Sequence, residues 1–173
     1  RGGKLTKQVP PIIQQIWDSA KVRRTPAEWA LRWVFDHPEV DCVLSGMSSM
    51  EQVRENVAVA AAGLPLSLTA DEKGLVEKVR DMYRQKLKVM CTDCGYCLPC
   101  PEGVDIPSIF GLLNDASIYD SVDESARWYA SYVNNQKDAL RCIECGQCIT
   151  ACPQGIPIIE LLKEAHEHLK ARE

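Results

Sequence analysis

The sequence has no long apolar run and no excess of basic residues. None of its apolar stretches approaches the ~20 residues that a helix needs to cross a bilayer. No charged, apolar and small-residue signal segment stands at its N-terminus. Its 20 Lys and Arg are outnumbered by 24 Asp and Glu, which gives a net charge of −4. Because phosphate backbones are bound by basic surfaces, we expect no nucleic acid as partner. From the lack of a long apolar run and of a signal segment, we expect no membrane partner and a cytoplasmic location.

Cysteine is scarce in the first half of the chain and frequent in the second. Of nine cysteines, only Cys42 lies before residue 91. In a small secreted protein this many cysteines would suggest disulfides, but without a secretion signal they are expected to bind metal. Cys42 stands alone between Asp41 and Val43, and we expect it to be a small buried hydrophobic residue.

The other eight cysteines form two runs of similar spacing. The first run is Cys91, Cys94, Cys97 and Cys100, and the second is Cys142, Cys145, Cys148 and Cys152. Three cysteines in C-x-x-C steps, then a fourth before a proline, are the ligand pattern of cubane iron–sulfur clusters. Gly95 and Gly146 allow the backbone to approach a cluster closely. The pattern therefore predicts two [4Fe–4S] clusters and one-electron transfer through them.

The fourth cysteine of each run has two alternative places. In two-cluster ferredoxins it ligates the cluster of the other run. One cluster would then take Cys91, Cys94, Cys97 and Cys152, and the second Cys142, Cys145, Cys148 and Cys100. The first run departs from the usual spacing, because two residues rather than three separate Cys97 from Cys100. Crossed and local ligation therefore both stay open for Cys100 and Cys152.

Structural zinc is the alternative to iron and sulfide, since four thiolates suit zinc as well. Zinc ribbons use two separated C-x-x-C pairs and have no use for a third evenly spaced cysteine and a terminal Cys-Pro in each run. A zinc-bound module would serve structure or docking without redox function. His166 and His168 point to different faces of a helix, so we expect a solvated tail there rather than a metal site.

Capping signals and hydrophobic periodicity predict a mostly helical chain. Helix starts are expected at Pro10–Pro11, Thr25, Ser48, Thr69, Ile106, Ser121 and Pro157. The segment from Val40 to Leu44 is short, apolar and bounded by turn residues, which predicts a buried strand. Helix, strand and helix in succession are typical of the end of an alternating α/β protein, whereas the cysteine half is expected to be all helical.

Three stretches of the first half resemble the C-terminal part of aldo/keto reductases, which are (β/α)8 barrels. They are Arg24–Val34 (RTPAEWALRWV), Val40–Ser49 (VDCVLSGMSS) and Glu51–Asn56 (EQVREN), and Arg1–Leu5 (RGGKL) is similar to the loop after the family's seventh strand. With the cysteine half, the whole chain resembles aldo/keto reductases that carry a C-terminal ferredoxin-like domain. The resemblance implies a partial barrel with one or two short strands over residues 1–88, then a helical ferredoxin domain with two clusters over 89–173.

The resemblance also implies a site for NADH or NADPH in the full-length protein. In that family, the loop after the eighth strand and the next helix hold adenosine and the 2′-phosphate, where a helix N-terminus offers unpaired amides. The matching positions are Gly46, Ser48, Gln52, Glu55 and Asn56, with Gly3 near the pyrophosphate. Many members place a basic residue early in this loop, but Gly46-Met47-Ser48 has none, so both nucleotides stay open. Ser48 and Glu51 have a second interpretation as a helix cap.

The family's catalytic aspartate, tyrosine, lysine and histidine have no counterpart in this chain. At most two of the eight barrel strands are present, and a barrel interior needs side chains from all of them. We therefore expect no carbonyl reduction by this chain alone. The chain is expected to be the electron-transfer part of an aldo/keto reductase-like oxidoreductase, acting with a redox partner protein or with the reductase half. A reductase activity in the full-length protein and a structural or docking module are the alternatives.

Overall fold

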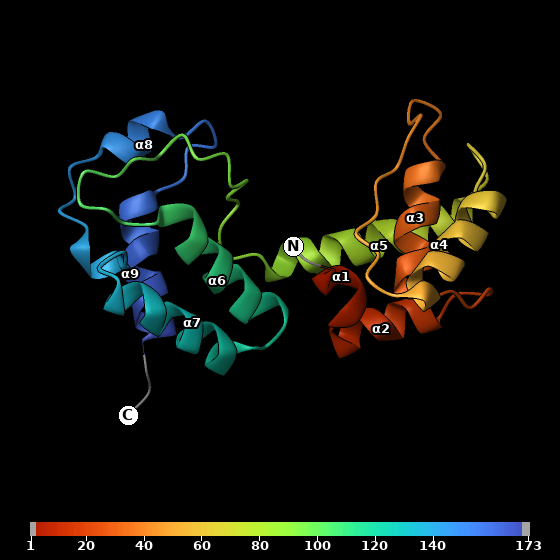
Figure 1. Cartoon of the computed structure of the whole chain (residues 1–173), viewed down its shortest axis with the longest axis horizontal. Coiled ribbons are helices and arrows are strands. Elements are labelled where there is room, and N and C mark those ends of the chain that lie inside the picture. The colour runs from red at the N-terminus through yellow and green to blue at the C-terminus, as the bar shows by residue number, and fades with distance from the viewer. Residues whose placement is uncertain (1–2, 171–173) are drawn as a thin grey trace. The chain divides into compact units, whose positions relative to one another are not determined.

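The computed structural model describes residues 3–170, which form helices joined by loops (Figure 1). Within this range no strand is formed, and no helix is long and apolar enough to span a membrane. The chain divides into two compact units, Arg1–Gln85 and Lys86–Glu173. Each unit has a hydrophobic core of its own.

The core of the first unit is built around a pair of tryptophans. The helices of this unit are α1 (Lys4–Lys7), α2 (Pro11–Asp18), α3 (Pro26–Phe35), α4 (Met50–Ala62) and α5 (Ala70–Lys86). Trp17 of α2 and Trp29 of α3 stack with ring centroids 5.1 Å apart. Ile13 and Val79 are buried in the same cluster, so α2, α3 and α5 share one core.

Helices α3 and α4 pack against each other and run in the same direction. Thr25, the N-cap of α3, donates a hydrogen bond of 2.5 Å to Glu55 in the first half of α4. At the other end, a side chain on Gly63, the C-cap of α4, would collide with Phe35, the last residue of α3. The N-termini of both helices therefore lie at the same end of the pair.

The predicted buried strand from Val40 to Leu44 is wrong. The segment between α3 and α4 has no regular structure, and the side chain of Leu44 is 93% exposed. An extended segment becomes a strand only when a neighbouring strand completes its hydrogen bonds, and none of the described residues supplies one. Cys42, predicted to be buried, is exposed in the same segment. The strand part of the predicted partial barrel is therefore not confirmed.

The second unit is a helical bundle that carries the two cysteine runs. Its elements are α6 (Ile106–Ile118), α7 (Val122–Asn134), the 3-10 helix η1 (Ala139–Arg141), α8 (Gln147–Ala151) and α9 (Ile158–Leu169). Helices α6, α7 and α9 pack against one another around a core that includes Ile109, Leu113 and Ala165, all fully buried. Six of the cysteines pack against this core. The predicted all-helical character of the cysteine half is confirmed within the described residues.

Asp36, at the end of α3, ties the loop ahead of α5 to the first unit. Its carboxylate accepts hydrogen bonds from Leu68 N–H at 2.7 Å and from Lys73 Nζ at 2.8 Å. Burial alone raises the pKa of this carboxyl, but the bonds from Lys73 and Leu68 outweigh it and hold the pKa below its usual value. Asp36 is 6% exposed, so these bonds lie at the edge of the core.

Replacing Asp36 by alanine is expected to lower the free energy of unfolding of the first unit by about 1–3 kcal/mol, because the buried Leu68 amide loses its acceptor. Since the folded pKa of Asp36 is depressed, its stabilisation is present above the unfolded pKa of about 4 and is lost as the pH falls through the folded pKa. Urea unfolding from about pH 7 down to about pH 3, followed by the fluorescence of the Trp17–Trp29 pair, measures both effects.

The exposed Asp41 offers the matched control. Asp41→Ala should change neither the urea concentration at the midpoint of unfolding nor the dependence of that midpoint on pH. An equal loss of stability in Asp41→Ala and Asp36→Ala would contradict the role assigned to the Asp36 carboxylate.

Candidate functional site

The two cysteine runs repeat the same backbone conformation. Asp93 and Glu144, each directly before the second cysteine of its run, have φ of 57° and 59°. The glycines after that cysteine, Gly95 and Gly146, have φ of 77° and 79°. Such left-handed angles are uncommon outside glycine and form tight turns. The similar spacing in the sequence thus folds into two similar loops.

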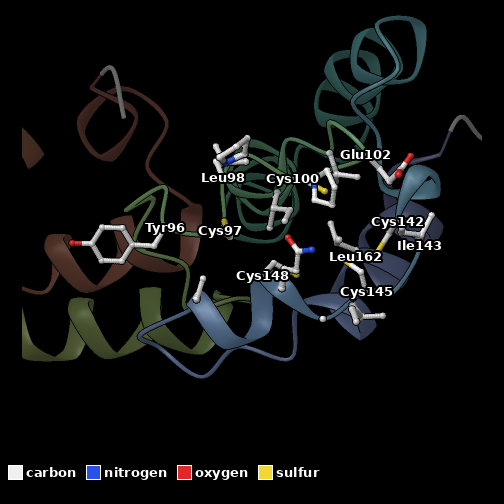
Figure 2. Close-up of a pocket in the computed structure, with 18 residues that line it drawn as sticks. Tyr96, Cys97, Leu98, Cys100, Glu102, Cys142, Ile143, Cys145, Cys148 and Leu162 are labelled. Atoms are coloured by element: carbon white, nitrogen blue, oxygen red, sulfur yellow. The ribbon is translucent and has the colours of Figure 1, made fainter.

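One cavity of about 140 Å³ is lined by cysteines from both runs. Figure 2 shows these side chains around a common space. The second run contributes Cys142, Cys145 and Cys148, and the first run contributes Cys97 and Cys100. Leu162 of α9 and Ile106 of α6 add apolar wall. Cys100 therefore lies at the cavity of the other run.

A smaller cavity of about 20 Å³ shows the reverse combination. It is lined by Cys91, Cys94 and Cys97 of the first run and by Cys152 of the second run. Phe110, Ile156 and Ile158 line it as well, and all three are buried. The fourth cysteine of each run thus lies at the cavity of the other run, as the crossed ligand sets require.

Burial and neighbouring cysteines make three of these thiols hard to ionise. Burial raises the pKa of Cys97 to about 11, and it also raises the pKa of Cys91 and Cys148. Neighbouring cysteines raise the pKa further: Cys94 and Cys152 act on Cys91, while Cys142 and Cys100 act on Cys148. The neighbours of Cys91 and of Cys148 belong to the two crossed sets, while the pKa of Cys97 is raised both by Cys91 of its own set and by Cys148 of the other. Thiolates held this close together need a cationic group between them.

The thiol donors at each cavity match, in number and kind, the ligands of a [4Fe–4S] cluster. A cubane takes each thiolate at a different iron, so its four ligands surround a volume. Zinc takes all four within about 2.3 Å of one ion, so its ligands converge on a point. In this chain the cysteines of each set line the walls of a cavity between apolar side chains. One cluster would be held by the cysteines at the cavity that Ile158 lines, and the other by the cysteines at the cavity that Leu162 lines.

Histidines do not line either cavity. The prediction that His166 belongs to a solvated tail is wrong, because its Nδ1 lies 3.0 Å from the buried Tyr129 hydroxyl. His168 is half-buried on the same helix. Within residues 3–170, no group of three or more His, Cys, Asp or Glu is arranged to hold a single metal ion.

A separate hollow of about 590 Å³ lies in the first unit, where α3 and α4 begin. Five of the six predicted nucleotide contacts line it, namely Gly3, Gly46, Gln52, Glu55 and Asn56. Thr25 and Pro26 at the start of α3 line it too. Asn56 Nδ2 donates a hydrogen bond of 3.0 Å to Ser45 Oγ, which fixes the loop ahead of α4. The hollow therefore gathers the residues that the resemblance singled out.

Ser48 is the predicted contact that does not line the hollow. Its backbone N–H donates to Gln52 Oε1 at 2.8 Å, while Ser49 rather than Ser48 caps α4. The predicted Ser48–Glu51 capping box is therefore displaced by one residue. In the predicted loop at the start of the chain, Arg1 and Gly2 lie outside the described residues.

Two protein-family models match separate parts of the chain. The aldo/keto reductase family model matches residues 4–80, and the 4Fe-4S dicluster domain model matches residues 90–156. The chain has an aldo/keto reductase-like region and a 4Fe–4S dicluster domain. The predicted resemblance is thereby confirmed, and iron–sulfur clusters are supported as the cofactors of the dicluster domain.

One relative is the acetyl-CoA decarbonylase/synthase complex subunit alpha 1 of Methanosarcina barkeri, which is 32% identical over 96 residues. The match covers 55% of this chain and 10% of the relative, so the chain spans about a tenth of that protein's length. No solved structure matches the chain. The likeness therefore concerns a segment of the relative and not its whole activity.

Two polar residues of the dicluster domain were missed in the sequence. Asn114 and Tyr129 are each 1% exposed, and they hydrogen-bond to the segments that lead into the two cysteine runs. A weak signal exists for Asn114, because it follows Leu112 and Leu113 in a helix of mainly apolar residues. Its partners, 25 and 26 residues away, give no such signal.

Proposed function

We propose that the dicluster domain holds two [4Fe–4S] clusters and is the electron-transfer part of an aldo/keto reductase-like oxidoreductase. The observation that carries the proposal is the crossed lining of the two cavities: the fourth cysteine of each run lies at the cavity lined by the first three of the other, and Cys97 lines both. Each cluster, when bound, supplies reversible one-electron exchange. The electrons would come from or go to a redox partner protein or the reductase half.

The wall between the cavities supports electron exchange between the two sites. Cys97, Tyr96 and Ile106 line both cavities, so the two proposed clusters would be neighbours. Cys97 and Cys148 belong to different sets, and Cys148 lies close enough to Cys97 to raise the pKa of the Cys97 thiol. The buried Ile106 excludes water from this wall. Exclusion of water around a metal site is one of the factors that set its reduction potential.

Crossed ligation is tested in a background with one site. In the triple variant Cys142→Ser, Cys145→Ser, Cys148→Ser, about four irons per chain should remain after anaerobic reconstitution. Adding Cys152→Ser should remove them, whereas adding Cys100→Ser should leave them, because Cys152 lies at the remaining cavity. Iron and sulfide analysis of each variant measures the result.

The exposed Cys42 provides the matched control, since it lines neither cavity. Cys42→Ser in the same background should keep all of the remaining iron. Loss of the cluster with Cys100→Ser but not with Cys152→Ser would establish local ligation. Bound zinc without sulfide in the unaltered chain would establish a structural zinc module instead.

We also propose that the first unit supplies part of an NADH or NADPH site in the full-length protein. The hollow at the start of α3 and α4 supports this, because it gathers five of the six residues at the family's nucleotide positions. The N-termini of two parallel helices favour an anionic group there, and Lys7 lines the same hollow. Carbonyl reduction itself is assigned to the full-length protein, since this chain has no counterpart of the family's catalytic residues.

Replacing Asn56 by alanine is expected to weaken nucleotide binding by about tenfold, because it removes a polar group from the hollow and frees the loop at Ser45. Calorimetric titration of this chain with NADPH and with NADH measures the effect and shows which nucleotide is preferred. Asn135→Ala, in the other unit, is the control and should bind as the unaltered chain does. An equal loss of nucleotide affinity in Asn56→Ala and Asn135→Ala would contradict the proposal.

A further inference from the structure

We propose that Asn114 and Tyr129 are positioning residues, each of which fixes one cysteine run so that its first three cysteines face the cavity of one cluster. The inference rests on the proposed function, because it concerns which cluster each residue supports. Neither residue is a proposed cluster ligand, and neither lines one of the two cavities.

Asn114 of α6 holds the segment that leads into the first run. Its Oδ1 accepts hydrogen bonds from the N–H groups of Lys88 and Val89, both at 2.9 Å. Its Nδ2 donates to the Val89 carbonyl at 2.8 Å. One side chain therefore satisfies three backbone groups of a segment that has no secondary structure of its own. Val89, which is 2% exposed, stands two residues ahead of Cys91.

A second pair of residues fixes the same segment to the end of α6. Ser117 Oγ donates to the Lys86 carbonyl at 2.7 Å. Lys86 Nζ reaches back to the Ile118 carbonyl at 3.4 Å and to Asp120 at 3.0 Å. Asn114 is the most deeply buried of these residues, and its partner Val89 lies closer to Cys91 than Lys86 does. Asn114 therefore fixes the position of the backbone just ahead of Cys91, where the first run begins.

Tyr129 of α7 holds the segment that leads into the second run. Its hydroxyl oxygen accepts a hydrogen bond from Ala139 N–H at 3.1 Å. The same hydroxyl lies 3.0 Å from His166 Nδ1 of α9, to which it donates when that nitrogen carries no proton. The Ala139 carbonyl in turn accepts from Cys142 N–H at 3.2 Å. A single phenol thus connects two helices to the first cysteine of the second run.

The two contacts share no partner. Asn114 binds backbone groups ahead of the first run, whereas the Tyr129 hydroxyl binds Ala139 ahead of the second run and His166 of α9. Because each cavity takes three cysteines from one run, each contact governs three of the four ligands at one site. A site assembled from ligands held in place loses less on binding and releases its group more slowly. Loss of one contact is therefore expected to affect one cluster and spare the other.

The test uses the whole chain with both clusters in place and two variants that keep nearly the same shape, Asn114→Leu and Tyr129→Phe. Anaerobic release of iron to a ferrous chelator is followed in each. Asn114→Leu should accelerate the release of about half of the iron by roughly tenfold and leave the other half unchanged. Tyr129→Phe should accelerate the other half.

Single-site backgrounds identify which half is affected. In the chain with Cys142→Ser, Cys145→Ser, Cys148→Ser and Cys100→Ser, only the first site remains. Asn114→Leu should accelerate iron release there, and Tyr129→Phe should not. The reciprocal background, with Cys91→Ser, Cys94→Ser, Cys97→Ser and Cys152→Ser, should reverse this result.

Two controls separate positioning from general loss of stability. Leu113→Ala removes a fully buried side chain next to Asn114 and should accelerate both halves alike. Tyr132→Phe removes a hydroxyl from the same helix as Tyr129 and should change nothing. If Asn114→Leu does not fold, Asn114→Asp keeps the acceptor for the Lys88 and Val89 amides and should give a smaller effect at the same site.

Equal acceleration of both halves in Asn114→Leu or Tyr129→Phe, or none in either, would overturn the inference while leaving the two clusters standing. An unaltered chain that binds no sulfide would overturn the proposed function itself, and the inference with it. The iron and sulfide content of the unaltered chain therefore separates the two failures.

Discussion

The second unit depends on the electrostatic cost of bringing thiols together. Burial raises the pKa of Cys97 to about 11 and also raises the pKa of Cys91 and Cys148, and neighbouring cysteines add to the rise at all three. Four thiolates at one cavity are favourable only with a strong positive charge among them. Ligand ionisation, cluster binding and folding are then linked, because the group that stabilises the thiolates also joins chain segments that are distant in sequence. The helices supply the remaining stability through a core that touches six of the eight cysteines.

The crossed arrangement makes the two cavities into one structural element. The first run closes the cavity of the second through Cys100, and the second run closes the cavity of the first through Cys152. Each run therefore lines both cavities, with its first three cysteines at one and its fourth at the other. Similar left-handed turns at Asp93 and Glu144 give the two loops the same local form. The differences lie in how the bundle holds them: α6 anchors the first through a carboxamide, and α7 with α9 anchor the second through a phenol.

The sequence predicts best what depends on local pattern. Helix starts at Thr25 and Thr69 follow from capping residues within one turn, and the structure forms both caps. The strand from Val40 to Leu44 fails because a strand depends on partners elsewhere in space, which the described residues do not provide. Asn114 and Tyr129 escape sequence reasoning for the related reason that their partners lie up to 37 residues away. Five of the six nucleotide positions lie together because the family pattern already encodes such distant contacts.

The most direct test of the account is the EPR spectrum of the anaerobically purified chain after dithionite reduction, with iron, sulfide and zinc analysis of the same sample. Two clusters that share the wall at Cys97 and Ile106 predict about eight irons and eight sulfides per chain. Their reduced signals should be broadened by magnetic interaction between neighbouring clusters. About two zincs per chain, with no sulfide and no EPR signal even after anaerobic reconstitution, would contradict the account and leave the cysteines with a structural role.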